Sequence, residues 1–350
     1  MSDVAEAPSA HVQSGLVPPG FMKQIASEFA PKPWLYWTDM LGSAAIGWSL
    51  FFFSLQLPPL SAMQGLATLG AIFALLRAAL FIHELCHIKP SRLPYFELAW
   101  NLVVGIPLLI PSLMYVGSHM DHHKRTAFGT AADPEYAPIA HWSRVRIAAF
   151  VLTVAFAPLV LPLRWGVLTP LSRLIPGLRP WVVGKVSTLV INTGYTRPLP
   201  RGTAVKRWDL EEAGAALFVW GVAALVLVGW IPGIFVAHWL VVGAGILVVN
   251  QVRTLAAHGY ENEGEPMDAE QQLLDSVNLT RWSLPSVLIA PVGLRYHALH
   301  HYLPSLPYHS LGSVHRRLLA ELPHDAPYRR TSSEGLHFTL QALWDRAAAH

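Results

Sequence analysis

The sequence predicts an all-α integral membrane protein, a helix bundle of about four transmembrane helices arranged in two hairpins. Three observations support this fold class. Of the 350 residues, 53% are hydrophobic and only 13% are charged, whereas soluble domains carry about 25% charged residues. Four apolar stretches approach the roughly 20 residues that a membrane-crossing helix needs. Lys and Arg are absent from the turns that join these stretches in pairs.

Two tight turns divide the apolar stretches into pairs. Pro58-Pro59 interrupts the first pair, and Pro232-Gly233 interrupts the second. Proline and glycine mark turns of this kind, so each pair is predicted to form a helical hairpin. The four predicted spans are residues 37–57, 62–82, 213–231 and 233–252.

The distribution of positive charge predicts the orientation of these spans. Short loops rich in Lys and Arg remain in the cytosol. Apart from Arg77, every Lys and Arg lies in the N-terminal tail, in residues 83–212 or after Gln251. An even number of crossings places these three regions on one side. We therefore expect both termini to be cytosolic.

Two further apolar stretches, residues 96–116 and 147–168, are long enough to cross a membrane, but each contains two prolines. The first stretch lies between two histidine clusters, described below, which must meet if they share a metal centre. One full crossing would place these clusters on opposite sides of the membrane. We expect both stretches to be re-entrant or to lie in the interface, supporting a cytosolic helical cap. Six full crossings are the alternative.

The chain is expected to have three parts. Residues 1–30, rich in Ala, Pro, Ser and Gly, are predicted to form a flexible tail. Residues 31–310 are predicted to form the membrane domain, and residues 311–350 a cytosolic helical tail. The net charge is only +3 with scattered Lys and Arg, so no nucleic-acid surface is predicted. The single cysteine, Cys86, excludes a disulfide framework and a cysteine zinc site.

The 17 histidines are the feature that most requires explanation. Eight of these histidines fall in three clusters with a regular spacing. One more, His258, follows the fourth predicted span. The clusters are His83-Glu84-Leu85-Cys86-His87, His119-Met120-Asp121-His122-His123 and His297-Ala298-Leu299-His300-His301.

The spacing within the clusters predicts a metal centre. His83 and His87 are four residues apart, so both lie on one helix face and can reach one ion. In each H-x-x-H-H cluster the first and second histidines share a face. The third is rotated by about 100° and is expected to reach a neighbouring ion. Neutral imidazole binds iron, zinc, copper and nickel well. Clustered imidazoles at a membrane are costly unless something binds them, so we predict a binuclear site.

The remaining histidines have no matching spacing and are expected not to bind metal. They are His11, His141, His238, His309, His315, His324, His337 and His350.

The first cluster also fits H-E-x-x-H, the motif of zinc metalloproteases. An intramembrane protease would use Glu84 as general base and His83 and His87 as zinc ligands. That alternative leaves two H-x-x-H-H clusters without a role. Under the metal-centre interpretation, Glu84 is expected to support a ligand histidine or to end its helix.

The order of the clusters resembles that of the membrane fatty acid desaturase superfamily over roughly residues 37–310. Residues 253–258 and 294–301 resemble the bacterial acyl-lipid branch in particular. The acyl-CoA branch has an asparagine four residues before the lone histidine, where this chain has Thr254, and Asn250 lies eight residues before it. A tenth ligand is therefore not predicted. The resemblance implies two non-haem iron ions bound by His83, His87, His119, His122, His123, His258, His297, His300 and His301.

The resemblance also implies an O2-dependent oxidation of an unactivated CH2 group, with O2 as co-substrate and no catalytic side chain beyond the metal ligands. Desaturation of the acyl chain of a lipid is the first expectation. Hydroxylation of a lipid or a carotenoid is the alternative, and a metal-storing or sensor protein without turnover is the non-enzyme alternative. The expected location is the bacterial inner membrane, among membrane lipids.

An external electron donor is expected, because the sequence contains no recognisable flavin or haem motif and no fused cytochrome b5 segment. A small acidic protein such as a ferredoxin would be attracted to basic residues near the histidine clusters. These residues are Lys124, Arg125, Arg316 and Arg317, which alternatively hold the chain against anionic lipid.

Overall fold

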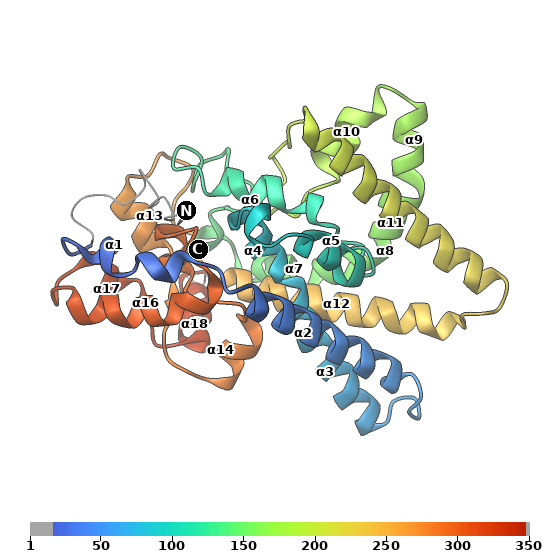
Figure 1. Cartoon of the computed structure of the whole chain (residues 1–350), viewed down its shortest axis with the longest axis horizontal. Helices are drawn as coiled ribbons and strands as arrows, with labels where there is room; N and C mark the ends of the chain where they lie inside the picture. The colour runs from blue at the N-terminus through green and yellow to red at the C-terminus, as the bar shows by residue number, and fades with distance from the viewer. Residues whose placement is uncertain (1–16, 348–350) are drawn as a thin grey trace, which may run out of the picture.

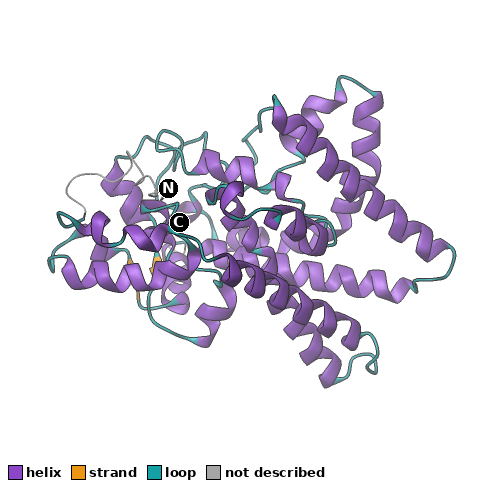
Figure 2. Ribbon diagram, in the orientation of Figure 1, coloured by secondary structure: helices purple, strands orange, loops and turns teal. Residues whose placement is uncertain are grey.

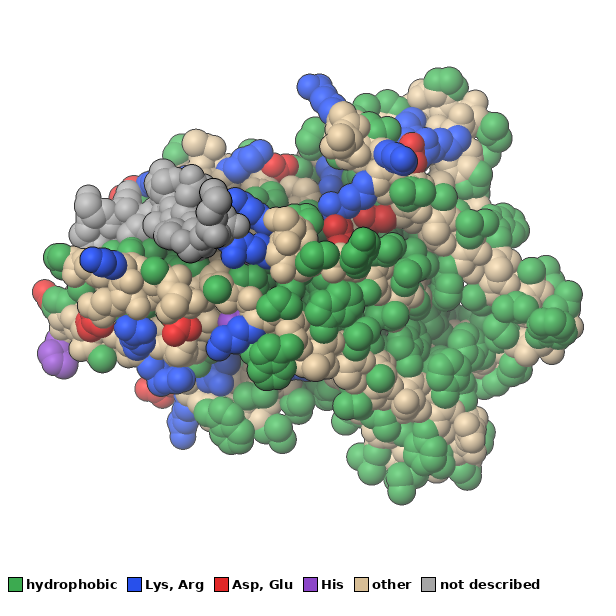
Figure 3. All heavy atoms as spheres, in the orientation of Figure 1, with side chains coloured by type: hydrophobic (Ala, Val, Ile, Leu, Met, Phe, Trp, Pro, Cys, Tyr) green, Lys and Arg blue, Asp and Glu red, His purple; other side chains and the backbone are tan. Residues whose placement is uncertain are grey.

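The computed structural model describes residues 17–347, which are mostly helical (Figure 2). Two long helical pairs project from a group of shorter helices, which we call the cap (Figure 1). Hydrophobic side chains cover most of the visible face of the projecting pairs, whereas charged side chains gather over the cap and near α10 (Figure 3). The arrangement confirms the predicted all-α membrane bundle.

The first pair consists of α2 (Pro33–Ser54) and α3 (Ala62–Ala79), and α3 continues through Leu80 into α4 (Phe81–His87). The side chain of Ser61 caps α3 by accepting a hydrogen bond from the backbone N–H of Gln64. The two helices approach closely at Gly47, where a Cβ atom would lie 2.6 Å from Cγ of Leu75. A larger residue at position 47 would push the hairpin apart.

The second pair consists of α11 (Thr203–Leu227) and α12 (Gly233–Leu255). Its inner helix α12 packs against α3, and the two hairpins are therefore in direct contact. The closest approach is at Gly245, where a Cβ atom would lie 2.4 Å from Cδ1 of Ile72. The cap-side ends of α4 and α12 consequently lie near each other.

Four helical segments have the length and apolar composition of a membrane span. Three correspond to the predicted spans and the fourth does not. The predicted span at 37–57 belongs to α2, which is not among the four, although its 22 residues would extend about 33 Å. This helix carries Asp39 and Ser43, which face protein rather than lipid. The four segments are Ala62–His87, Arg144–Leu174, Thr203–Leu227 and Gly233–Leu255.

The fourth segment, Arg144–Leu174, is an arch rather than a straight helix. At its start, Arg144 contacts the C-terminal helix in the cap. In the middle, the carbonyl of Gly166 accepts a hydrogen bond from Trp220 of α11. At its end, Arg173 pairs with Asp209, two turns from the cap-side end of α11. Both ends therefore lie on the cap side, as predicted for a re-entrant segment. The arch comprises α7 (Arg144–Thr153), η6 (Val154–Phe156), α8 (Ala157–Leu163), the π-helical η7 (Arg164–Leu168) and α9 (Thr169–Leu174).

The stretch at 96–116 also returns to the side from which it enters. The hydroxyl of Ser112 donates to Glu97 over 2.7 Å, and the backbone N–H of Ser112 donates to Asn101 over 2.9 Å. Its beginning and end are thus held side by side, as predicted. The stretch contains α5 (Phe96–Trp100), the π-helical η3 (Asn101–Gly105) and η4 (Ser112–Met114), and leads into α6 (Val116–His122).

The cap collects the remaining elements except α10. Phe21 and Ile25 are fully buried in it against α16, while residues 1–16 of the predicted flexible tail lie outside the described residues. The domain boundaries near residues 30 and 310 stay predictions. α10 (Leu178–Lys185) lies apart from the cap, beside α9 and α11 (Figure 1). The other elements are α1 (Phe21–Gln24), η1 (Ala26–Phe29), η2 (Pro90–Arg92), η5 (Ile139–His141), α13 (Ala269–Asp275), β1 (Asn278–Leu279), α14 (Leu284–Ile289), α15 (His297–Tyr302), α16 (Tyr308–Glu321), α17 (Pro327–Arg330), β2 (Ser332–Ser333, parallel to β1) and α18 (Leu336–Arg346).

Candidate metal centre

All nine histidines predicted to bind metal meet at the cap-side ends of the bundle. They are supplied by α4, by α6 and the residue after it, by the loop after α12, and by α15. They form two groups, and within each group one nitrogen from every ring lies within 4.8 Å of the others. The first histidine group is His83, His87, His119, His123 and His300, and the second histidine group is His122, His258, His297 and His301.

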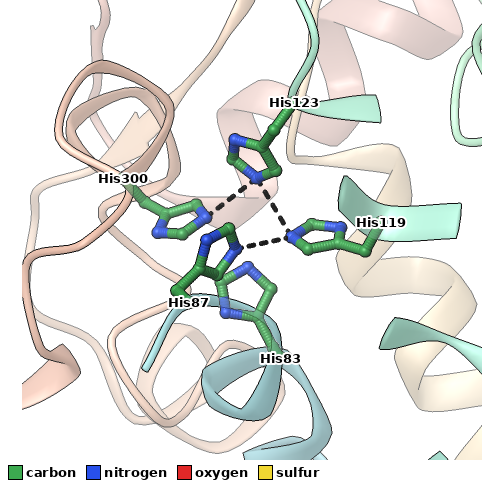
Figure 4. A group of neighbouring side chains, drawn as sticks. All are labelled: His83, His87, His119, His123 and His300. Carbon is green, nitrogen blue, oxygen red and sulfur yellow. Dashed lines mark hydrogen bonds between the residues drawn. The ribbon is translucent and has the colours of Figure 1, made fainter. Parts of the chain in front are cut away.

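The first histidine group surrounds a small central space (Figure 4). Nε2 of His119 lies 3.0 Å from Nε2 of both His87 and His123. Nε2 of His300 lies 3.1 Å from Nε2 of His123. The ring of His83 packs against that of His300 with 4.3 Å between centroids. Five imidazoles from three helices thus converge on one point.

The second histidine group likewise brings the ring nitrogens of four imidazoles close together. Nε2 of His301 lies 3.2 Å from Nε2 of His122 and 3.0 Å from that of His297. Nε2 of His297 lies 2.9 Å from that of His258. His301 also stacks on His123 with 4.3 Å between ring centroids, so the two groups are adjacent.

The H-x-x-H-H clusters divide between the groups differently from the prediction. The first and last histidines of each cluster share a group, and the middle one joins the other group. Helix geometry explains the difference. The last histidine is rotated by about 40° from the first, whereas the middle one is rotated by about 60° in the opposite direction. His122 therefore lies in the second histidine group, apart from His119 and His123. His300 lies in the first histidine group, apart from His297 and His301.

Three carboxylates, two of them buried and that of Glu135 half-buried, lie beside the Nδ1 atoms of ligand rings, and the sequence interpretation missed them. Nδ1 of His119 lies 2.9 Å from Glu135, and Nδ1 of His122 lies 2.8 Å from Asp133. Nδ1 of His258 lies 3.1 Å from a carboxylate oxygen of Asp275. A carboxylate accepts the Nδ1 proton and leaves the Nε2 lone pair facing the group, as ligand histidines require. The available signal was the pair of acidic residues at 133 and 135, shortly after the second cluster.

Electrostatics keep most of these rings neutral. Burial, followed by repulsion from neighbouring histidines, lowers the pKa of His123, His300 and His301 well below its usual value. Burial also acts to lower the pKa of His122, but the carboxylates of Asp133, Glu135 and Asp275 together outweigh it and the pKa is raised. Neutral imidazole is the form that coordinates metal.

The donor set fits metal ions better than hydrogen bonding alone. Both ring nitrogens of His83 are buried without a hydrogen-bond partner among the described residues, and so is Nδ1 of His297. Such atoms cost free energy unless something binds them. In the second histidine group, the lone pairs of His122 and His258 both face the centre, so the three Nε2–Nε2 contacts cannot all be good hydrogen bonds. A cation in the first histidine group would satisfy one nitrogen of His83. A cation in the second histidine group would accept the Nε2 lone pairs that these contacts leave in conflict.

Glu84 does not face either histidine group. Its Oε2 accepts hydrogen bonds from the hydroxyl of Tyr36 over 2.5 Å and from the backbone N–H of Tyr308 over 3.2 Å. Its other oxygen lies 3.8 Å from Nδ1 of His83. Glu84 therefore joins α2, α4 and α16, which is not the position of a general base in a zinc protease.

None of the other described histidines belongs to either histidine group. Nε2 of His238 lies 2.6 Å from the hydroxyl of Ser54, and Nδ1 of His315 lies 2.7 Å from that of Tyr328. His11 and His350 lie outside the described residues. Of the residues considered for a tenth ligand, Thr254 bonds the carbonyl of Asn250 instead.

Two hollows are lined by different histidines of the metal centre. A cavity of about 160 Å³, the inner cavity, is lined by His83 and mostly by apolar side chains of α3, η3 and α12. A wider cleft of about 680 Å³, the outer cleft, is lined by His87, His123 and His301. Lys124 and Arg125 also line the outer cleft, whereas Arg316 and Arg317 do not.

Comparison with known proteins adds to this geometry. A family model described as fatty acid desaturase matches residues 58–332, a range that includes both histidine groups. A ceramide hydroxylase from Caulobacter vibrioides (strain NA1000 / CB15N) is 42% identical to this chain over 316 residues, which cover 90% of each chain. The family match runs from the turn before α3 to β2.

Proposed function

Because this chain belongs to the fatty acid desaturase family, as an integral membrane enzyme that oxidises lipids, we propose that it hydroxylates a ceramide-type lipid with two iron ions and O2. The observation that carries the proposal is the likeness to a ceramide hydroxylase over nine-tenths of both chains. It favours the hydroxylase alternative over the desaturation that the sequence first suggested.

The nine histidines are the proposed ligands, five for one iron and four for the other. The bound metal would supply reduction of O2 and removal of hydrogen from an unactivated CH2 group. In hydroxylation, one oxygen atom of O2 enters a C–H bond and the other leaves as water, with two electrons and two protons supplied from outside. Desaturation would instead remove two hydrogen atoms from neighbouring carbons and release both oxygen atoms as water.

The protein contributes position and exclusion of water. The apolar inner cavity would hold an alkyl chain beside His83, since its walls include Leu76, Val104 and Leu108. Asp133 and Glu135 hold the Nδ1 protons of two ligand histidines and so fix their lone pairs. An alkyl chain held in one position relative to the histidine rings would be oxidised at one CH2 group rather than at many.

Electrons are proposed to arrive through the outer cleft, because three of the histidines line it together with Lys124 and Arg125. Lys124 and Arg125 would attract a small acidic donor such as a ferredoxin. We place the enzyme in the bacterial inner membrane with the cap in the cytosol, because the cap carries nearly all Lys and Arg.

Lipid mass spectrometry tests the function. A host that makes ceramide would express the wild-type chain or the matched variant His300→Ala, which removes one proposed ligand. The proposal predicts a ceramide heavier by one oxygen atom only with the wild type. A product lighter by two hydrogen atoms would establish desaturation and overturn the proposal, and so would an unchanged ceramide pool.

A further inference from the structure

The inner cavity contains a guanidinium group that the reaction described above does not use. Arg253, in the last turn of α12, lines the cavity together with His83. It is the only Lys or Arg among the lining residues in the described part of the chain. A charge in a largely apolar pocket is costly unless something pairs with it. Glu135, which also lines the cavity, interacts with Arg253 electrostatically but forms no ion pair with it.

The described residues provide hydrogen-bond acceptors for only two of the three nitrogens of this guanidinium group. Nε donates to the side-chain oxygen of Asn250 over 2.9 Å, and Nη2 donates to the hydroxyl of Thr254 over 3.2 Å. Both partners are neutral. Within residues 17–347, Arg253 forms no ion pair with a carboxylate, and its Nη1 has no hydrogen-bond partner. Guanidinium offers five N–H donors, so several remain for a ligand.

The one carboxylate on the cavity wall is already committed. Glu135 lies 2.9 Å from Nδ1 of His119 and accepts from the hydroxyl of Tyr115 over 3.1 Å. The unused N–H groups of Arg253 are therefore the charged hydrogen-bond donors that a ligand in this cavity would meet, and they lie beside apolar walls. Its polar lining residues Asn250, Gln251 and Thr254 flank Arg253 on the same helix, and this defines a polar end.

We propose that Arg253 binds the acyl carbonyl oxygen of the substrate and so selects lipids whose alkyl chain begins at a carbonyl group. The inference rests on the proposed function for its choice of lipid. An amide carbonyl accepts hydrogen bonds from guanidinium without bringing a second charge into the cavity. The attached alkyl chain then lies along the apolar walls and passes His83. A fatty acid carboxylate presents the same oxygen chemistry, and the experiment distinguishes the two.

The test measures binding without turnover. Purified, metal-loaded protein without reductant would be titrated with three probes of equal chain length: a short-chain ceramide, a neutral dialkyl ether that has no carbonyl, and a fatty acid. Arg253→Gln removes the charge, Arg253→Lys keeps the charge but not the planar fork, and Arg281→Gln is the control at an exposed arginine. Metal content and thermal stability of each variant would be measured in parallel.

The proposal predicts that Arg253→Gln weakens ceramide binding by about 10- to 100-fold, the usual loss for a hydrogen bond to a charged group. The affinity for the ether should not change. The ceramide affinity of Arg253→Lys should lie between those of Arg253→Gln and the wild type, and that of Arg281→Gln should match the wild type. Equal weakening of ceramide and ether would mean that Arg253 only supports α12, and would overturn the proposal. Weakening of fatty acid binding alone would identify a carboxylate ligand and overturn the amide assignment. Because binding is read without turnover, failure of the proposed hydroxylation would leave this result unaffected.

Discussion

Replacing Asp133 by Asn changes the support of one ligand histidine while keeping the shape of the side chain. Asp133 is fully buried, and its two oxygens lie 2.8 and 2.9 Å from Nδ1 of His122. The same oxygens accept the backbone N–H groups of Gly129 and Glu135, each over 2.8 Å. Asparagine has one acceptor oxygen and a donor in place of the other, so it cannot satisfy all three N–H groups.

The expected loss is specific to the second histidine group. Removing a carboxylate that orients a ligand histidine lowers metal affinity by about 10- to 100-fold, which corresponds to about 1.4–2.8 kcal/mol of binding free energy. The first histidine group, which does not use His122, should keep its affinity. Asp133→Asn should therefore release one ion before the other.

The assay is metal content after dialysis against increasing concentrations of a chelator. Wild-type protein should lose its ions over one range of chelator, and Asp133→Asn should lose one equivalent at about 10- to 100-fold lower chelator concentration. Asp121→Asn is the matched control, because Asp121 neighbours the cluster but bonds Lys124 and Tyr195 instead. If Asp133→Asn retained both ions as the wild type does, the argument that this carboxylate fixes the Nε2 lone pair would be wrong.

Three further predictions concern the site, the membrane and the donor. Glu84→Gln should keep measurable turnover, because Glu84 joins helices, whereas His300→Ala should abolish turnover, as a hydroxylation assay would reveal. A cysteine introduced at Gln56 should react with a membrane-impermeant thiol reagent only from the side opposite the cap. Reversing the charges of Lys124 and Arg125 should lower the turnover rate with reduced ferredoxin and flatten its dependence on salt.

Each of these predictions has a control and an opposite outcome. If Glu84→Gln were inactive while His300→Ala remained active, the protease alternative would be favoured. Labelling requires a Cys86→Ser background, and modification at Gln56 from the cap side would refute the predicted orientation. Reversal of Arg316 and Arg317 is the control for donor docking, since neither lines the outer cleft. Equal effects of the two reversals would mean that the donor does not enter by the cleft.

The sequence predicted much of the fold because membrane burial imposes simple constraints. Long apolar stretches and the turn at Pro58-Pro59 predicted the hairpins, and the need for the histidine clusters to meet predicted the re-entrant stretch at 96–116. α2 falls short of the apolar composition of the other spans, because it carries polar side chains such as Asp39 and Ser43, which bond within the protein. The arch at Arg144–Leu174 satisfies the length and composition of a span, and only tertiary contacts such as Arg173 with Asp209 show that it returns.

Eight of the nine candidate ligands were predictable because their spacing matches helix periodicity, and His258 was added through the resemblance to the desaturase superfamily. Their division into groups of five and four was not, because it depends on how α6 and α15 face each other across the cap. The roles of Asp133, Glu135 and Asp275 depend on long-range folding of loops, for which the sequence offers no periodic signal. Arg253 had no predicted role of its own, because its place on the wall of the inner cavity depends on how α12 packs against the rest of the fold.

The central claim is that the two histidine groups each hold an iron ion. The most direct measurement is the iron content per chain of protein purified after growth with ample iron, determined together with zinc. The account predicts close to two irons per chain, falling to close to one in a variant that lacks both His258 and His297. A single tightly bound metal ion in the wild-type protein would contradict the account.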